Sequence, residues 1–144
     1  MASTGNSEPD VEEIADGYLR FSDSLAPENF DPDSASDPND PDEQAWNLVN
    51  SAIKNGPPER AWALVIAILQ RSPDERLGFH TAGPLEDVVR RWGAALVDHI
   101  EAEAAADERF RWALGGIWLK GSGELPIDIL ARIVAASDGE IKPL

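Results

Sequence analysis

The sequence contains no cysteine, only two histidines and one methionine, and just 12 basic residues against 27 acidic ones. The lack of cysteine excludes a disulfide framework, a thiolate metal site and a cysteine nucleophile. No apolar run approaches the roughly 20 residues that a membrane-spanning helix needs. The first nine residues are polar and lack the basic start and apolar stretch of a secretory signal. We therefore expect a cytoplasmic protein that does not bind membranes.

The shortage of positive charge is concentrated at one end of the chain. The formal net charge is −15, and residues 1–43 hold 13 acidic side chains against one basic side chain, Arg20. The remaining residues hold 14 acidic side chains against 11 basic ones, which leaves them nearly balanced. A negative field repels nucleic acid and speeds the encounter with a basic protein. The same acidic segment could also serve only to keep the protein soluble.

Apolar residues recur every three or four positions along most of the chain, which is the spacing of helices with one buried face. No segment alternates apolar and polar residues, so we expect no β-sheet. The predicted fold is all-α, a compact bundle of six to eight helices. Residues 1–9 are expected to be a disordered leader, and residues 10–144 a single helical domain. The pattern predicts helices over 10–25, 42–54, 58–71 and 72–80, then one opened by Gly83-Pro84, one from Asp107 to Gly121 and Gly123, and a last one from Pro126.

Two of the predicted helices begin with similar sequences, Glu43–Val49 and Glu59–Val65. This similarity makes helical-hairpin packing of the HEAT type one arrangement to consider, although three or more units are normally needed for a solenoid. The apolar run of residues 61–69 predicts a central helix. Asp10, Ser72 and Asp107 are expected to cap helix N-termini.

An acidic, proline-rich loop is expected over residues 26–42, because its four prolines exclude a helix or a central strand. Its aspartates Asp31, Asp33 and Asp37 suggest calcium at first sight. However, an EF-hand counted from Asp31 needs glycine at position 6 and glutamate at position 12. Ser36 and Asp42 stand there instead. We therefore expect no calcium at this loop.

No pattern for catalysis or for a cofactor is present. The sequence has no Gly-x-Ser-x-Gly elbow, no His-Glu-x-x-His pair and no glycine-rich phosphate loop, so we expect no metal, no cofactor and no catalytic set. His80 is expected at a helix end, where it would satisfy terminal carbonyls, and His99 at the edge of an apolar stripe. Four of the five tryptophans fall on apolar stripes. Trp112 does not, and it is either an exposed aromatic anchor or partly buried against a neighbouring helix.

Three motifs carry a resemblance to a known family: Ala61-Trp62 at a helix start, Ala82-Gly83-Pro84-Leu85-Glu86-Asp87 opening a helix, and Asp107-x-x-Phe110-Arg111-x-Ala113-Leu114. Over about residues 42–120 the chain resembles an uncharacterised bacterial family of small helical proteins, known only as a domain of unknown function. The resemblance implies a small bacterial α-protein. It implies no activity, cofactor or catalytic residue.

Three functions are compatible with these features. The first is a non-catalytic protein-binding module, such as an immunity or antitoxin-type inhibitor of a basic partner protein. The second is a scaffold or regulatory subunit that binds through an apolar helical groove. The third is a small-molecule-binding protein or enzyme that uses His80 beside a helix start at Pro84. For the first two, the candidate partner-binding residues are Phe30, Asp31, Asp33, Asp37, Asp40, Asp42 and Trp112.

Overall fold

The computed structural model describes residues 10–25, 39–117 and 125–137, and within these ranges it contains helices and no strand. The all-α fold class and the predicted number of helices are therefore confirmed. The elements are α1 (Val11–Ser24), α2 (Pro41–Asn55), α3 (Pro58–Arg71), the single 3-10 turn η1 (Asp74–Arg76), α4 (Leu77–Ala106), α5 (Glu108–Gly115) and α6 (Ile127–Ala136).

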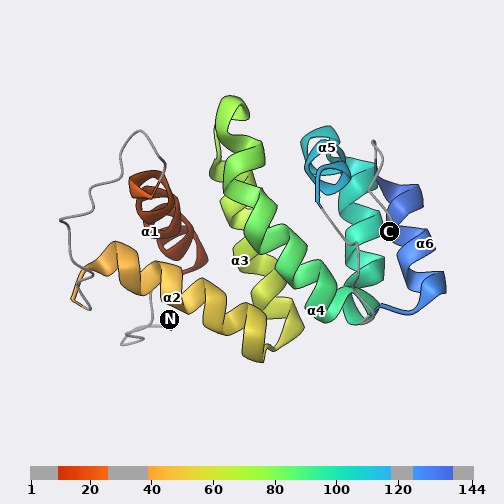
Figure 1. Ribbon diagram of the computed structural model, residues 1–144, viewed down its shortest axis with the longest axis horizontal. Helices are drawn as coiled ribbons and strands as arrows, with labels where there is room; N and C mark the ends of the chain where they lie inside the picture. The colour runs from red at the N-terminus through yellow and green to blue at the C-terminus, as the bar shows by residue number, and fades with distance from the viewer. Residues whose placement is uncertain (1–9, 26–38, 118–124, 138–144) are drawn as a thin grey trace, which may run out of the picture.

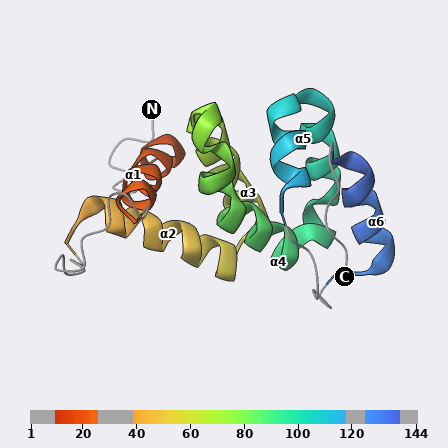
Figure 2. The ribbon, with the colours of Figure 1, turned by 45° about the horizontal axis from the view of Figure 1, so that its top comes forward.

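The long helix α4 connects the two ends of the molecule. It packs against α2 and α3 on one side and against α5 and α6 on the other, and α1 lies on α2 and α3. Figures 1 and 2 show α1 and α2 at one end and α5 and α6 at the opposite end. Because α3 contacts α1, α2 and α4, its predicted central position is confirmed. In both views α2 and α3 diverge from the turn that joins them.

Local capping interactions start three of the helices. The Asp10 side chain accepts a hydrogen bond from the Glu13 amide at 2.8 Å, and the Asp107 side chain accepts one from the Arg109 amide at 2.9 Å. Both predicted caps are confirmed. Asp40 caps α2 in the same way, because its side chain accepts from the Asp42 amide at 3.0 Å. Such caps satisfy amides that would otherwise have no partner in the first turn.

The prediction for the segment between α3 and α4 was wrong in two respects. Ser72 ends α3 instead of starting a helix, and its hydroxyl donates to the Ile68 carbonyl at 2.8 Å. The next α-helix runs without a break from Leu77 to Ala106, with Pro84 inside it. An interior proline costs about 3 kcal/mol. The buried face of α4 continues across Pro84, from Leu77 and His80 before it to Leu85 and further residues after it. The burial of these side chains outweighs the cost of the proline.

The helix that follows is shorter than predicted. α5 ends at Gly115, and the Gly116 amide donates to the Ala113 carbonyl at 3.1 Å as the chain leaves the helix. The predicted end at Gly121 and Gly123 lies outside the described residues. Paired glycines lower helix propensity by about 1 kcal/mol each, which accounts for the early end.

Two glycines permit close helix contacts. A Cβ atom added at Gly93 of α4 would lie 2.8 Å from Leu125 Cδ2 and 3.4 Å from Ile133 Cδ1 of α6. A Cβ atom at Gly17 of α1 would lie 2.8 Å from the Ala45 Cβ atom of α2. Both the added Cβ atom and the Ala45 Cβ atom are fixed to the backbone and cannot move aside by a side-chain rotation. The separation of α1 and α2 at this point is therefore one that only glycine allows.

We expect Gly17→Ala to destabilise the protein by about 1–2 kcal/mol, because overpacking outweighs the gain of about 1 kcal/mol in helix propensity. Gly83→Ala is the matched control, because a Cβ atom there would meet nothing within 4 Å. It should stabilise the protein by about 0.5–1 kcal/mol. Urea unfolding of both variants checks this. Equal effects would mean that the α1–α2 contact does not limit stability.

Candidate functional site: an acidic groove around Trp112

The short helix α5 presents one large aromatic side chain to solvent. Phe110, Ala113 and Leu114 face the core, as expected for residues three and four positions apart on one face. Trp112 points away from this face and is 57% exposed. Of the two predictions left open for Trp112, the exposed aromatic is confirmed.

Trp112 borders a groove of about 500 Å³ between η1, the start of α4 and α5. The side of its ring lies over the first turn of α4, where a Cβ atom on Gly78 would be 3.5 Å from the indole. Leu77 is buried, with 3% of its surface exposed, and supplies apolar surface to the groove. The remaining lining residues are charged: Asp74, Asp107, Glu108 and Arg109.

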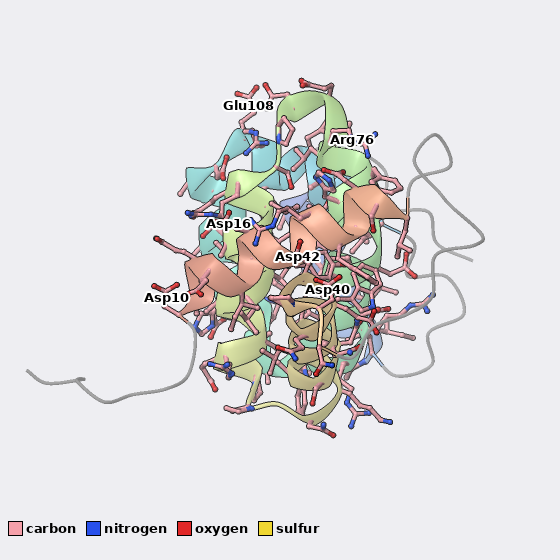
Figure 3. All side chains as sticks on the ribbon, turned by 90° about the vertical axis from the view of Figure 1, so that its left-hand side faces the viewer. Asp10, Asp16, Asp40, Asp42, Arg76 and Glu108 are labelled. Carbon is pink, nitrogen blue, oxygen red and sulfur yellow. The ribbon has the colours of Figure 1, made fainter. Side chains whose placement is uncertain are left out.

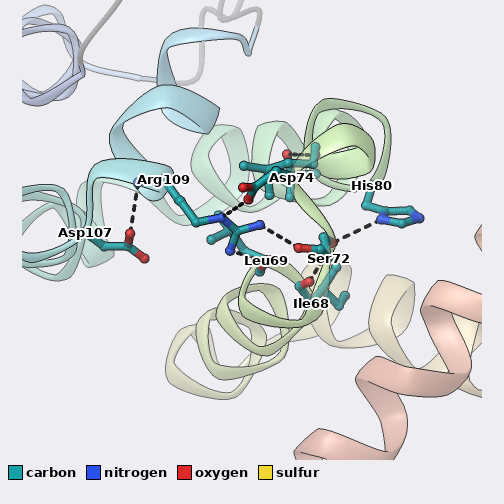
Figure 4. Close-up of polar contacts among 9 residues, drawn as sticks. Ile68, Leu69, Ser72, Asp74, His80, Asp107 and Arg109 are labelled. Carbon is teal, nitrogen blue, oxygen red and sulfur yellow. Dashed lines mark hydrogen bonds and ion pairs between the residues drawn. The ribbon is translucent and has the colours of Figure 1, made fainter.

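The guanidinium of Arg109 is half-buried and held by three hydrogen-bond acceptors (Figure 4). Its Nε donates to Asp74 Oδ1 at 2.8 Å, one terminal nitrogen donates to the Leu69 carbonyl at 3.2 Å, and the other donates to the Ser72 carbonyl. Leu69 and Ser72 lie at the C-terminal end of α3, where the helix dipole is negative. Arg109 therefore joins α5 to η1 and to the end of α3.

The charge of the groove is negative. Its lining contains three carboxylates and one guanidinium, and the guanidinium donates to Asp74 and to the Leu69 and Ser72 carbonyls. The Asp74 side chain remains 86% exposed although it accepts from Arg109. Asp107 caps α5, and Glu108 occupies the first turn beside it. The groove therefore favours a cationic group and repels an anion.

A second polar cluster lies nearby, and Figure 4 shows its Ser72 and His80 members. His80 Nε2 is 2.8 Å from Asp23 Oδ1, and His80 Nδ1 is 3.1 Å from Ser72 Oγ. Arg76 also donates to Asp23, at 2.8 Å. His80 is 2% exposed and lies in the first turn of α4, so its predicted place at the C-terminal end of a helix, where it would satisfy terminal carbonyls, was wrong. The helix start expected at Pro84 was also wrong, because α4 begins at Leu77.

The Ser72, His80 and Asp23 side chains resemble a hydrolytic triad in composition only. A nucleophilic serine must reach its substrate, but Ser72 is 4% exposed and its hydroxyl donates to the Ile68 carbonyl. Burial raises the pKa of Asp23, but hydrogen bonds from His80 and Arg76 outweigh it and hold that pKa below its ordinary value. Ionised Asp23 therefore ties the end of α1 to η1 and α4.

The other histidine and the other described tryptophans make contacts that stabilise the fold. His99 is exposed and lies edge-on to the buried Trp62, with ring centroids 6.2 Å apart, which confirms its position at the edge of an apolar stripe. Trp92 is half-buried and donates from its indole to the Ile53 carbonyl at 2.7 Å. Trp46 is half-buried and stacks on Tyr18. Trp118 lies outside the described residues.

Two of the predicted partner-binding aspartates also take part in the fold. Asp40 caps α2, and Asp42 accepts from Arg20 of α1 at 3.1 Å. Both lie at the α1–α2 end of the molecule (Figure 3), whereas Trp112 lies on α5 at the other end. The predicted residues Phe30, Asp31, Asp33 and Asp37 lie outside the described residues. Across 10–25, 39–117 and 125–137, therefore, the predicted residues do not form one patch.

Ion pairs between helices neutralise several acidic residues of this end. Besides the Arg20–Asp42 pair, Arg71 of α3 lies 2.6 Å from Asp16 of α1.

Among the described residues there is no group of three or more acidic or histidine side chains that could hold a metal ion. In the same part of the chain, no helix has both the length and the apolarity required to cross a lipid bilayer.

Comparison with known proteins places these features in a family. A family model described as a family of unknown function, DUF6869, matches residues 34–141. The chain belongs to this family. No curated protein and no solved structure matches it. The DUF6869 match includes every residue of the Trp112 groove, whereas α1 and Asp23 precede it.

The match confirms the family resemblance found in the sequence and extends it beyond residues 42–120 at both ends. The motif Ala82–Asp87, expected to open a helix, lies instead within α4 of this DUF6869 protein. The groove could be anticipated only in part. Trp112 was signalled by its position off the apolar stripe, but nothing local in the sequence indicates that Arg109 reaches Asp74, 35 residues away.

Proposed function

We propose that this DUF6869 protein is a non-catalytic protein-binding module that contacts its partner through the Trp112 groove. The observation that carries the proposal is the exposure of Trp112 beside a groove of about 500 Å³. Tryptophan is enriched among the few residues that supply most of the binding energy at protein interfaces. Such anchors are most effective in a pocket from which the partner excludes water.

The partner that fits best is a basic protein, and the module would act in the cytoplasm as an inhibitor of the immunity or antitoxin type. The net charge of −15 supports this proposal, because complementary charge raises association rates. The acidic lining of the groove supports it at the contact surface itself. A scaffold that binds through a purely apolar groove is less well supported, because four of the six lining residues are charged.

We expect Trp112→Ala to weaken partner binding by roughly 30-fold or more, the loss typical of an interface hot spot of about 2 kcal/mol. The test is affinity capture from a lysate of the source organism, followed by measurement of the affinity for the retained protein. Leu48→Ala is the matched control, because Leu48 is a 40% exposed apolar residue on α2, away from the groove.

A partner retained by the wild type and by Leu48→Ala but lost from Trp112→Ala supports the proposal. Equal retention by all three proteins would show that the groove is not the contact surface. Circular dichroism of each variant verifies that the helices are intact. Binding to the wild type should also weaken as salt rises, because long-range charge attraction is screened.

A further inference from the structure

We propose that the Trp112 groove receives an arginine side chain of the partner, stacked on the indole and hydrogen-bonded to Asp74 and Glu108. This inference rests on the proposed function and specifies which chemical group the groove recognises. It follows from three features: the charge of the lining, the exposed indole and the origin of the carboxylates on two different elements.

The charge of the lining selects a cation. Asp74, Asp107 and Glu108 supply three negative charges, and Arg109 supplies one positive charge. Arg109 directs its hydrogen bonds to Asp74 Oδ1 and to the carbonyls at the end of α3. An anionic ligand would therefore meet carboxylates first, whereas a cation would gain their attraction in a partly enclosed site.

The exposed indole selects a cation that can stack. Tryptophan gives the strongest cation–π interactions among the aromatic side chains, and guanidinium groups use them more often than ammonium groups. Within the described residues, two arginines already make cation–π contacts. Arg91 Cζ lies 5.4 Å from the Trp92 ring centroid, and Arg76 Cζ lies 4.8 Å from the Phe79 ring centroid. Trp112 is more exposed than Phe79, at 57% against 46%.

The carboxylates favour arginine over lysine. Asp74 lies on η1 and Glu108 on the first turn of α5, so they approach the groove from different elements. A planar guanidinium has five N–H donors and can bond two carboxylates while it stacks on a ring. An ammonium group is a compact, strongly hydrated point charge that leaves the ring face largely uncovered.

The experiment is a titration followed by nuclear magnetic resonance of the Trp112 indole N–H, which is assigned by its absence in Trp112→Phe. The probe is N-acetyl-arginine N-methylamide. Its lysine, citrulline and glutamate counterparts are the comparison ligands, and citrulline is the neutral isostere of arginine. We expect a saturable shift with arginine at a Kd on the order of 10 mM. Lysine should bind several-fold more weakly, and citrulline and glutamate should give no saturable shift.

Two variants test the carboxylates. Asp74→Asn combined with Glu108→Gln should weaken arginine binding by about 10-fold, the effect expected when charge-assisted hydrogen bonds become neutral ones. Glu108→Gln alone leaves the bonds of Arg109 intact and should give an intermediate loss. Glu59→Gln is the control, because it removes a carboxylate at the opposite end of α3 from Leu69. It should bind arginine as the wild type does.

The outcomes separate this inference from the proposed function. If Trp112→Ala loses the partner but the arginine probe gives no saturable shift, the groove binds protein without recognising arginine, and the inference is wrong. Equal shifts with arginine and citrulline would overturn it as well, because charge would then play no part. If Trp112→Ala retains the partner, the proposed function itself fails, whatever the probe shows.

Discussion

Replacing Phe110 with alanine should lower the free energy of unfolding by about 3–5 kcal/mol, the cost of removing a fully buried aromatic ring. Phe110 has no exposed surface and packs edge-on against Trp62, with ring centroids 5.6 Å apart. It joins the short helix α5 to α3, and α5 has only eight residues with which to hold its place. Because small domains have a total stability of about 5–15 kcal/mol, this loss should be visible as a large fall in the urea midpoint.

The control lies two residues further along the same helix. Trp112→Ala removes a larger aromatic side chain, but one that is 57% exposed, so we expect a loss of no more than about 1 kcal/mol. The expected effects on binding are reversed, since Trp112→Ala should strongly weaken partner binding while a folded Phe110→Leu variant should retain it. Similar losses of stability for Phe110→Ala and Trp112→Ala would contradict this division between core and surface.

The parts of the fold that were predicted correctly depend on neighbouring residues. Asp10 and Asp107 cap helices because their side chains accept from amides two or three positions away. The alternation between buried Phe110 and exposed Trp112 follows from the period of an α-helix. Interactions of this kind depend only on residues a few positions apart, so a short stretch of sequence is enough to identify a helix and its buried face.

The start of α4 could not be predicted in this way, because local and tertiary preferences disagree there. Ser72-Pro73 and Gly83-Pro84 each have the composition of a helix start. The structure instead uses Ser72 to end α3 and continues α4 through Pro84. Residues buried on both sides of Pro84 decide the outcome, and their burial depends on the packing of α4 against α2 and α3.

In the candidate site, too, local sequence predicts one part and long-range contacts determine the other. Trp112 could be recognised from the pattern of a single helix. The negative charge of its groove depends on contacts across the chain, because Asp74 and Arg109 are 35 residues apart and belong to different elements. The part-buried contact between Asp23 and His80 spans 57 residues, so periodicity gave no signal for it. Whether the acidic residues between 26 and 38 contact a partner stays a prediction.

Replacing His80 with alanine should lower the free energy of unfolding by about 2–4 kcal/mol. The imidazole is 2% exposed, so its removal leaves a cavity, and its contacts with Ser72 and Asp23 are lost. Ser72 would keep its bond to the Ile68 carbonyl, and Asp23 would keep Arg76. His99→Ala is the control. It removes the other histidine of α4, which is exposed, and should cost less than about 1 kcal/mol.

Measuring stability at acid pH tests whether loss of the His80–Asp23 contact contributes to the destabilisation by His80→Ala. The pKa of Asp23 is lower in the folded protein than its ordinary value. Ionised Asp23 therefore stabilises the fold above about pH 4, and this contribution is lost as pH falls through the lowered folded-state pKa. His80→Ala removes one of the donors that lower this pKa, so its stability should fall less steeply below about pH 4. Urea unfolding at pH 7, 4 and 3 measures both slopes. Equal acid slopes in the two proteins would show that His80 stabilises the fold by packing alone.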